Sequence, residues 1–320
     1  AVNEPVDRAR PRARGLLTAV LRRAIRERDD LLREAEGLPT WQRYSVPEHL
    51  YEGWHEAFGE EEASRIAATI NSPAPIFVRS NPLRGGLTDH DLEEAGATRV
   101  EGEADFYRVA ELPHDALQEG RCYVQDPSTA AAPALLDAQP GERVLDACSA
   151  PGGKCAIIAA AMGDSGEIVA VDLSEDRASR LCENLDRLAV TNTRVEVLDL
   201  LREPLPNWAG EDSFDRILLD APCSNTGVLR RRPDARWRLA PNFAEHMASL
   251  QLRLSRATLR LLKPGGRFVY STCSIEPEEN RAVIDALLNE NSGLSMVREC
   301  AIMPSAEHDG AYSAALDRLR

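Results

Sequence analysis

Two cysteines stand where a cysteine can do chemistry. Cys223 follows the run "LLDAP" and Cys273 follows "YST", and each run ends an apolar segment typical of a buried strand. A free cysteine usually packs in a core as a small apolar residue. These two instead stand at strand ends, where side chains meet ligand, and a thiol is partly thiolate near neutral pH. We therefore expect both thiols in one cleft, within about 10 Å of each other.

Four acidic residues also end predicted strands. They are Asp146, Asp172, Asp199 and Asp220. An acid at one strand end is often only a helix cap or a loop anchor. Four of them at successive strands of a parallel sheet indicate a shared cleft, because ligands bind beyond the carboxyl ends of such strands.

The first of these strands leads into the turn "DACSAPGGKCA". Gly152 and Gly153 open a helix there, and its backbone amides can receive an anion. The Gly-x-Gly-x-x-Gly pattern of a dinucleotide site is absent, which argues against a nicotinamide oxidoreductase. Asp172 is placed to accept ribose hydroxyls, and Asp199 could flank an adenine. A nucleoside that carries a carboxylate fits this site, and S-adenosylmethionine is such a molecule.

The elements that position these residues alternate regularly from residue 141 onward. The predicted strands are 142–148, 166–173, 193–200, 214–222 and 265–274, the helices 152–162, 174–189 and 247–262, and 309–319 is a last, antiparallel strand. Apolar strands that alternate with amphipathic helices predict an α/β fold, a doubly wound and mostly parallel sheet. Before it we expect a helical segment at 1–72 and a small α+β domain at 73–125, so that the sheet domain occupies 126–320.

The charge of the chain is unevenly distributed. The net charge is −14, yet residues 8–28 carry +7 and residues 230–238 carry +4. The second cluster adjoins Cys223, and its members Arg230, Arg231, Arg232, Arg236 and Arg238 could track a nucleic-acid backbone, with Trp237 as a stacking face or a packing residue. A charge run is usually a solvated surface, but this one borders a candidate site.

The seven cysteines and the hydropathy indicate the redox state and the cellular compartment of the protein. No Cys-x-x-Cys pair is present, so neither a disulfide framework nor a metal site is favoured, and we predict a reduced, cytoplasmic protein. No run of 18 apolar residues appears, so no membrane partner is expected.

Four motifs together resemble the RsmB/Sun family of RNA cytosine-5 methyltransferases. They are "DACSAPGGK", "VAVDLSEDR", "LLDAPCSNTGVLRRRPD" and "YSTCSIEPEEN", and the resemblance is strong over about residues 121–290. The segment "RGLLTAVLRRAIR" resembles the last helix of the NusB-like domain of bacterial members, most of which we expect to be absent.

The resemblance implies a Rossmann-like class I methyltransferase and a role for each site residue. The methionine part of S-adenosylmethionine would be held by Cys148, Ser149, Ala150, Pro151, Gly152, Gly153 and Lys154. Asp172 would hold the ribose and Asp199 the adenine, while Asp220 would border both the cofactor and the target cytosine. Cys273 would be the nucleophile, and Cys223 would help to release the product.

These residues suit the reaction that the resemblance implies. Carbon 5 of cytosine is too weak a nucleophile to take a methyl group unaided, and a thiolate that adds to carbon 6 makes it reactive. Asp220 could stabilise the charge that builds in the ring. The base must be unpaired or flipped to enter the cleft.

Several alternatives stay open. Small-subunit ribosomal RNA is the expected substrate and tRNA the alternative, with a monomer expected. A DNA cytosine methyltransferase would use Cys223 as its nucleophile and leave Cys273 unexplained. An amino-group methyltransferase needs no thiol. A non-catalytic RNA-binding or ribosome-assembly factor would retain the fold without turnover.

Overall fold

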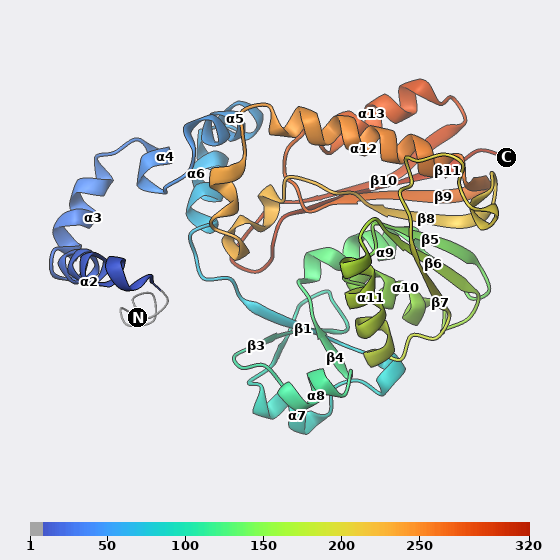
Figure 1. The fold of residues 1–320 in the computed structure, drawn as a ribbon, viewed down its shortest axis with the longest axis horizontal. Helices are drawn as coiled ribbons and strands as arrows, with labels where there is room; N and C mark the ends of the chain where they lie inside the picture. The colour runs from blue at the N-terminus through green and yellow to red at the C-terminus, as the bar shows by residue number, and fades with distance from the viewer. Residues whose placement is uncertain (1–8) are drawn as a thin grey trace. The chain divides into compact units, whose positions relative to one another are not determined.

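The computed structural model describes residues 9–320, which form two compact units that divide after Ala68 (Figure 1). The first unit is helical, as predicted. Its helices are α2 (Pro11–Arg26), α3 (Arg28–Glu36), α4 (Thr40–Arg43), α5 (Glu48–Phe58) and α6 (Glu60–Thr69), the last ending one residue beyond the division. Helices α5 and α6 bury apolar residues, whereas α2 and α3 bury none.

The second unit begins with a small antiparallel sheet. Its strands are β1 (Ile76–Ser80), β2 (Thr98–Arg99), β3 (Phe106–Val109) and β4 (Cys122–Val124), in the order β2-β3-β1-β4. Two short helices, α7 (Asp89–Glu94) and α8 (His114–Gln118), accompany it (Figure 1). Their shared core is small and includes Val78, Val109 and Cys122.

A seven-stranded sheet forms the rest of the second unit. Its order is β10-β11-β9-β8-β5-β6-β7. The bounds are β5 (Arg143–Ala147), β6 (Glu167–Asp172), β7 (Thr193–Val197), β8 (Phe214–Asp220), β9 (Leu262–Thr272), β10 (Leu294–Ile302) and β11 (Ala311–Arg318). Strands β5 to β9 are parallel, and β11 is antiparallel to both of its neighbours. This is the predicted doubly wound, Rossmann-like sheet.

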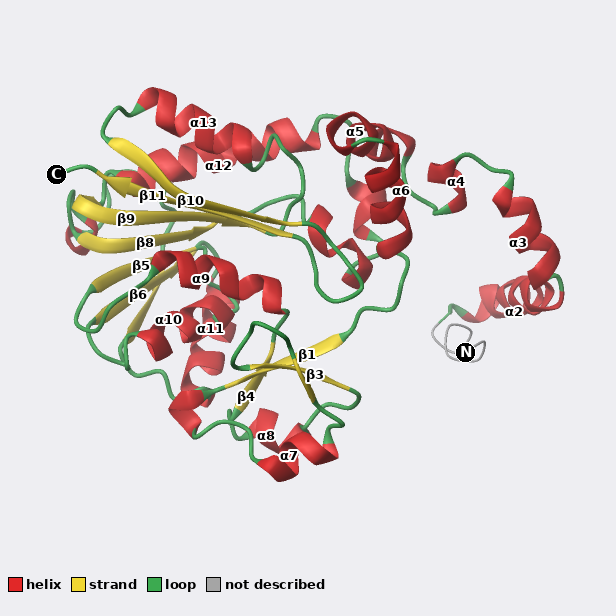
Figure 2. Ribbon diagram, turned by 180° about the vertical axis from the view of Figure 1, so that it is seen from behind, coloured by secondary structure: helices red, strands yellow, loops and turns green. Residues whose placement is uncertain are grey.

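Helices cover both faces of this sheet (Figures 1 and 2). They are α9 (Ala131–Leu136), α10 (Gly153–Ala161) and α11 (Glu175–Arg187) on one face, with α12 (Phe243–Leu259) and α13 (Arg281–Glu290) on the other. The strands are therefore apolar on both sides. Val144 and Leu145 are consecutive and fully buried, and they pack in two different clusters.

The order of the strands fixes where the site must lie. Strands β6 and β7 are added to the sheet on one side of β5, whereas β8 and β9 are added on its other side. The order of the strands therefore reverses between β5 and β8. Ligands of open α/β sheets bind at such a reversal, beyond the carboxyl ends of the strands. The strands that end at this edge carry Asp172, Asp220 and Thr272 as their last residues.

The C-terminal strands were predicted only in part. The expected antiparallel strand at 309–319 is confirmed as β11. Strand β10 was not predicted, because it forms the edge of the sheet and its residues are mostly exposed and lack an apolar alternation. In the part of the chain that the structure describes, no helix has both the length and the apolar character to cross a membrane.

One buried amide joins the small sheet to the large domain. Asn81 is fully buried, and its Nδ2 donates to the carbonyl of Gly120 at 2.8 Å and to that of Leu188 at 2.9 Å. Its Oδ1 accepts from the backbone N–H of Leu83 at 3.2 Å. Leu188 follows α11, so this side chain ties the loop after β1 to the helical layer of the large sheet.

Replacing this amide tests the junction. Asn81→Ala leaves two buried carbonyls without their donor, and we expect the free energy of unfolding to fall by about 1–3 kcal/mol. Urea denaturation followed by circular dichroism measures it. Asn289→Ala, the same change at an exposed position of α13, should stay within about 0.5 kcal/mol of the wild type. Equal stability of the two variants would contradict the proposed junction.

Candidate active site

The turn after β5 has a backbone that few sequences can adopt. Cys148 has a φ of 62° and Gly152 a φ of 101°, both in the left-handed region. A Cβ on Gly152 would also lie 2.7 Å from Cδ1 of Leu181. Helix α10 begins at the next residue, Gly153, so its first backbone amides point toward the turn. The predicted glycine turn is therefore present, with Gly152 required by both φ and space.

Asp146 lies in the interior beneath this turn. It is fully buried, and the Ser149 hydroxyl donates to its Oδ2 at 2.6 Å. Burial is the main cause that raises its pKa, to about 7, and the Asp220 carboxylate adds to the shift. Asp146 is therefore a buried acid that anchors the turn through Ser149.

Asp172 and Asp199 differ in their surroundings. Asp172 is only 3% exposed; it accepts from the backbone N–H of Ala150 at 3.2 Å and pairs with Arg177 at 3.1 Å. A carboxylate offers about four acceptor positions, so Asp172 can still accept from a ribose hydroxyl. Asp199 is exposed and accepts from the N–H of Leu201 at 3.0 Å. The turn, the buried acid and the exposed acid together fit a nucleoside with a carboxylate.

An ion pair links the turn to the next strand. Nζ of Lys154 lies 2.7 Å from Oδ2 of Asp220, the last residue of β8. Burial opposes the charge of Lys154, but the Asp220 carboxylate outweighs it and raises the pKa of the amine. Negative charge on Cys273 raises it further, which places the ammonium within electrostatic reach of that thiol. Lys154 is therefore a cation paired with an acid, and it lines a cavity together with Cys273.

The two cysteine thiols lie side by side. Sγ of Cys223 is 3.2 Å from Sγ of Cys273, which confirms the expected proximity. A hydrogen bond with Cys273, and then burial, raise the pKa of Cys223 well above its usual range. The Cys273 thiol donates to Oδ1 of Asn225 at 3.2 Å, and Nδ2 of Asn225 donates to the carbonyl of Cys223 at 2.8 Å. Cys223 is therefore held as a neutral thiol beside Cys273.

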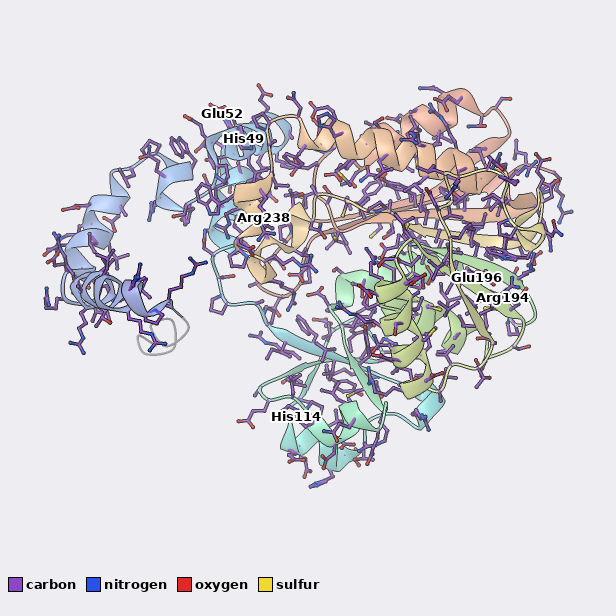
Figure 3. The ribbon with its side chains drawn as sticks, in the orientation of Figure 1. His49, Glu52, His114, Arg194, Glu196 and Arg238 are labelled. Atoms are coloured by element: carbon purple, nitrogen blue, oxygen red, sulfur yellow. The ribbon has the colours of Figure 1, made fainter. Side chains whose placement is uncertain are left out.

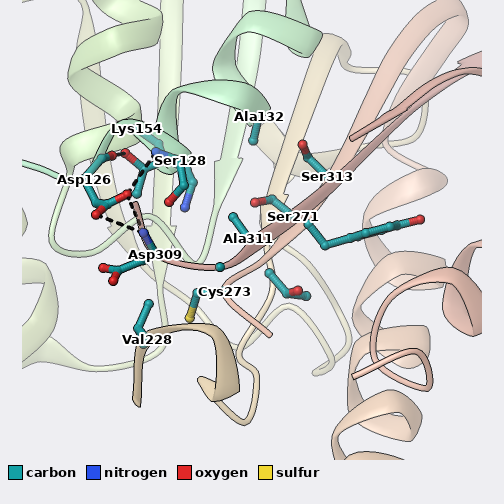
Figure 4. Close-up of a pocket in the computed structure, with 14 residues that line it drawn as sticks. Asp126, Ser128, Ala132, Lys154, Val228, Ser271, Cys273, Asp309, Ala311 and Ser313 are labelled. Atoms are coloured by element: carbon teal, nitrogen blue, oxygen red, sulfur yellow. Dashed lines mark hydrogen bonds between the residues drawn. The ribbon is translucent and has the colours of Figure 1, made fainter. Parts of the chain in front are cut away.

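A cavity of about 420 Å³ opens beside the ion pair. It is lined by Asp146, Ser149, Pro151, Gly153, Lys154 and Asp220 of the large domain, by Phe77, Tyr123, Val124 and Gln125 of the small sheet, and by Asp126, Thr129, Arg231, Arg232 and Asp309. A smaller adjoining cavity is lined by Cys273 with Lys154, Asp126 and Asp309, among others (Figure 4). Within residues 9–320 no group of three His, Cys, Asp or Glu side chains is placed to hold a metal ion.

The five arginines predicted to face nucleic acid divide into two groups. Arg230 is 7% exposed and bonds Asp309 and the Ser305 carbonyl, both at 2.6 Å. Arg236 is 2% exposed and donates to the carbonyl of Ile70 at 3.1 Å. For these two the prediction is corrected, because buried internal acceptors occupy their guanidinium groups.

The other three arginines reach the surface. Arg231 pairs with Asp309 and with Asp126, at 2.9 Å from the latter, yet its side chain remains one-third exposed. Arg231 and Arg232 line the large cavity. Arg238 extends from the turn η5 (Ala235–Arg238) into solvent (Figure 3).

Sequence reasoning missed two residues of the site. Asn225 has a φ of 63°, and its position in the loop after Cys223 carried no distinguishing sequence signal. Asp309 binds Arg230 and Arg231 from the C-terminal loop. The dipeptide Asp309-Gly310 before the last strand could have marked this loop, because such a pair favours a tight turn.

Comparison with known proteins identifies similar chains. A family model described as 16S rRNA methyltransferase RsmB/F matches residues 133–313. The ribosomal RNA small subunit methyltransferase B of Vibrio cholerae is 38% identical, over 99% of this chain and 76% of that protein. Its counterpart from Serratia proteamaculans is 36% identical, over 90% of this chain and 67% of that protein. A methyltransferase homologue from Pyrococcus horikoshii has a similar crystal structure, with a TM-score of 0.74, 29% identity and coverage of 88% of this chain and 98% of that one.

The raised pKa of Asp146 predicts a pH-dependent stability. Its pKa of about 7 in the folded chain exceeds the ordinary 3.8, so its ionisation costs nothing below pH 4 and opposes folding increasingly between pH 4 and 7. Asp146→Asn removes this cost. The unfolding free energy of the variant minus that of the wild type should be larger at pH 8 than at pH 5, by about 2 kcal/mol. Urea denaturation at both pH values measures it, with the exposed Asp176→Asn as control; a pH-independent difference would contradict the raised pKa.

Gly152 offers a second test of the turn. Gly152→Ala forces an alanine to a φ of 101° and against Leu181, a strain of about 1–3 kcal/mol. We expect the dissociation constant for S-adenosylmethionine to rise at least about tenfold, measured by calorimetry. Gly163→Ala is the matched control, because Gly163 also has a positive φ but open space around it. Unchanged binding by Gly152→Ala would rule out this turn as the cofactor site.

Proposed function

This chain belongs to the family of 16S rRNA methyltransferases RsmB/F, which are S-adenosylmethionine-dependent RNA methyltransferases, and we propose that it methylates carbon 5 of a cytosine through a covalent adduct with Cys273. The observation that carries the proposal is the pair of thiols 3.2 Å apart beside the Lys154–Asp220 ion pair. An amino-group methyltransferase would need no thiol, and here there are two. Small-subunit ribosomal RNA is the proposed substrate, in line with the names of the relatives.

Cys273 is the proposed nucleophile. Its thiolate adds to carbon 6 of the cytosine ring, a carbon–sulfur bond forms, and the electron pair of the carbon 5–carbon 6 double bond makes carbon 5 nucleophilic. Lys154, the cation that pairs with Asp220, lines the same cavity as Cys273. Cys223 is unsuited to this step, because its raised pKa keeps it protonated.

Bound S-adenosylmethionine supplies the methyl group as an electrophilic sulfonium methyl. We propose that the turn of residues 148–154 holds its methionine part, that Asp172 accepts from the ribose and that Asp199 lies beside the adenine. The amides that open α10 and the nearly buried Asp172 support this orientation. Asp220 then borders both the cofactor and the base, where its side chain can stabilise the charge that builds in the ring.

Product release completes the cycle. The proton leaves carbon 5 to a base, the carbon 5–carbon 6 double bond re-forms, and the carbon–sulfur electron pair returns to Cys273. Cys223 is the proposed helper of this step. Its thiol lies 3.2 Å from the departing sulfur and can donate a proton to it.

RNA is proposed to enter from the side of the small sheet. Arg231 and Arg232 line the cavity opposite Tyr123 and Gln125, so a strand that delivers a flipped base would pass between basic side chains and the sheet at 73–125. We propose three functional parts: the N-terminal segment 1–72, which is helical within its described residues, the small sheet at 73–125 and the domain at 126–320. We propose that the protein acts as a monomer in the cytoplasm, and its free thiols suit that reducing setting.

The cysteine variants test the reaction directly. With labelled S-adenosylmethionine and 16S ribosomal RNA or tRNA, Cys273→Ala should lose all detectable 5-methylcytosine, because no adduct can form. Cys223→Ala should accumulate a protein–RNA species on a denaturing gel, since release is impaired. Cys182→Ala, an exposed thiol on α11, should behave as the wild type.

Other outcomes would point elsewhere. The reverse pattern would make Cys223 the nucleophile, as in DNA cytosine methyltransferases. Transfer to tRNA alone would correct the substrate. RNA binding by the wild type without transfer to either RNA would favour an RNA-binding or assembly factor.

The exposed arginines predict a salt dependence. Arg232→Ala should weaken binding of single-stranded RNA and reduce the slope of log K against log salt by about 1, because one phosphate contact is lost. Fluorescence anisotropy at several salt concentrations measures it. Arg253→Ala, an exposed arginine on α12, serves as control and should leave the slope unchanged. An unchanged slope for Arg232→Ala would exclude Arg232 from the RNA path.

A further inference from the structure

One buried carboxylate contacts both of the loops that carry the reactive thiols. Glu279 is fully buried just before α13. Its Oε2 accepts from the backbone N–H of Ser224 at 3.0 Å, and its Oε1 accepts from the hydroxyl of Ser274 at 2.9 Å. Ser224 directly follows Cys223, and Ser274 directly follows Cys273. Each oxygen of this carboxylate is therefore bonded one residue away from a different thiol.

The carboxylate itself is fixed to a helix. Nε2 of Gln251, on α12, donates to Oε2 of Glu279 at 2.8 Å and to the carbonyl of Pro222 at 2.9 Å. Gln251 is fully buried, so its amide has no competing water. The hydroxyl of Tyr270 donates to the backbone carbonyl of Glu279 at 2.6 Å. Hydrogen bonds from α12 and β9 thus fix the position of Glu279, and Glu279 in turn fixes the positions of the loops that carry Cys223 and Cys273.

The surrounding hydroxyls extend this arrangement. The Ser274 hydroxyl lies 3.1 Å from that of Ser224 and 3.1 Å from that of Thr226. The next residue, Asn280, accepts from the hydroxyl of Thr272 at 2.6 Å and donates to the Ser274 carbonyl at 2.9 Å. The loop of Cys273 is consequently held on both sides of its thiol, which favours a single conformation.

We propose that Glu279 is a positioning residue, whose carboxylate aligns the loops of Cys223 and Cys273 so that the two thiols act on one cytosine. The inference rests on the proposed two-cysteine reaction. Hydrogen bonds to a carboxylate are shorter and stronger than those between neutral groups. All of the carboxylate's donors described above are uncharged, so the negative charge serves as an acceptor for two loops and not as half of an ion pair.

The near-isosteric amide discriminates this role from simple space filling. Glu279→Gln keeps the volume but replaces one acceptor oxygen with an NH₂ group. This group would face either the Ser224 N–H and the Gln251 amide, or the Ser274 hydroxyl. At least one loop loses its acceptor, and a misplacement on the order of 1 Å can cost about 100-fold in rate.

Disulfide formation measures the alignment without RNA or cofactor. Diamide takes up the two electrons and two protons that the thiols lose when a Cys223–Cys273 disulfide forms. Peptide mapping by mass spectrometry separates this product from those of the other five cysteines. In the folded wild type the thiols at 3.2 Å should couple readily. We expect the rate in Glu279→Gln to fall at least about tenfold, since alignment is lost.

Two further variants keep the test decisive. Glu278→Gln makes the same change at the adjacent exposed position and should couple at the wild-type rate. Ser274→Ala removes the Oε1 contact, together with the other contacts of the Ser274 hydroxyl, but keeps both donors to Oε2. It should give an intermediate rate, which decides the matter if Glu279→Gln does not fold. Circular dichroism at the assay temperature confirms folding, and a merely structural role would lower the melting temperature without slowing disulfide formation in the folded protein.

Activity supplies the second readout. In Glu279→Gln we expect kcat for methyl transfer to fall at least about tenfold while KM for S-adenosylmethionine stays unchanged, because Glu279 does not contact the cofactor turn. Wild-type coupling rates in both Glu279→Gln and Ser274→Ala would overturn the inference. So would failure of the wild-type thiols to couple. A wild type that couples its thiols yet makes no 5-methylcytosine would instead refute the proposed function and leave the alignment role standing.

Discussion

The ion pair between Lys154 and Asp220 is the contact on which the rest of the site depends. It joins the turn after β5 to the end of β8, the two strands between which the order of the sheet reverses. Lys154 is partly buried, and the neighbouring acid offsets the cost that this burial imposes on its charge. The same ammonium lies within electrostatic reach of Cys273, so the turn that is proposed to hold the cofactor is linked to the thiol that is proposed to attack the base. Breaking the pair would leave a partly buried charge without its partner.

The sheet explains why such distant residues meet. Cys223 and Cys273 are separated by 50 residues but follow neighbouring parallel strands, β8 and β9. Parallel strands bring their carboxyl ends to one edge, so any two polar residues placed there become neighbours. The exact spacing of the sulfurs is a different matter. It is set by the loops after the strands, where Asn225 and Glu279 supply the hydrogen bonds.

This division also explains what the sequence could predict. Apolar strands and the acids that end them mark the sheet and its edge, because burial on both faces leaves a pattern in composition. The roles of Arg230 and Arg236 were mispredicted. The sequence does not show which arginines of a basic segment bind buried acceptors in the folded chain and which reach solvent. Glu279 was missed for the same reason: its two partners lie in different loops, one of them 55 residues away, and only the folded chain brings them together.

The buried arginines have a consequence for RNA recognition. Arg230 and Arg231 bind Asp309, which lies in the loop before β11. The basic segment is therefore anchored next to the C-terminal strands. The anchoring leaves Arg231 and Arg232 at the cavity with a restricted set of positions, which lowers the conformational entropy that ordering them on a phosphate would cost. A protein with a net charge of −14 would repel RNA over most of its surface. Under the proposed function, the few cations that line the cavity would restrict RNA binding to the place where the base enters.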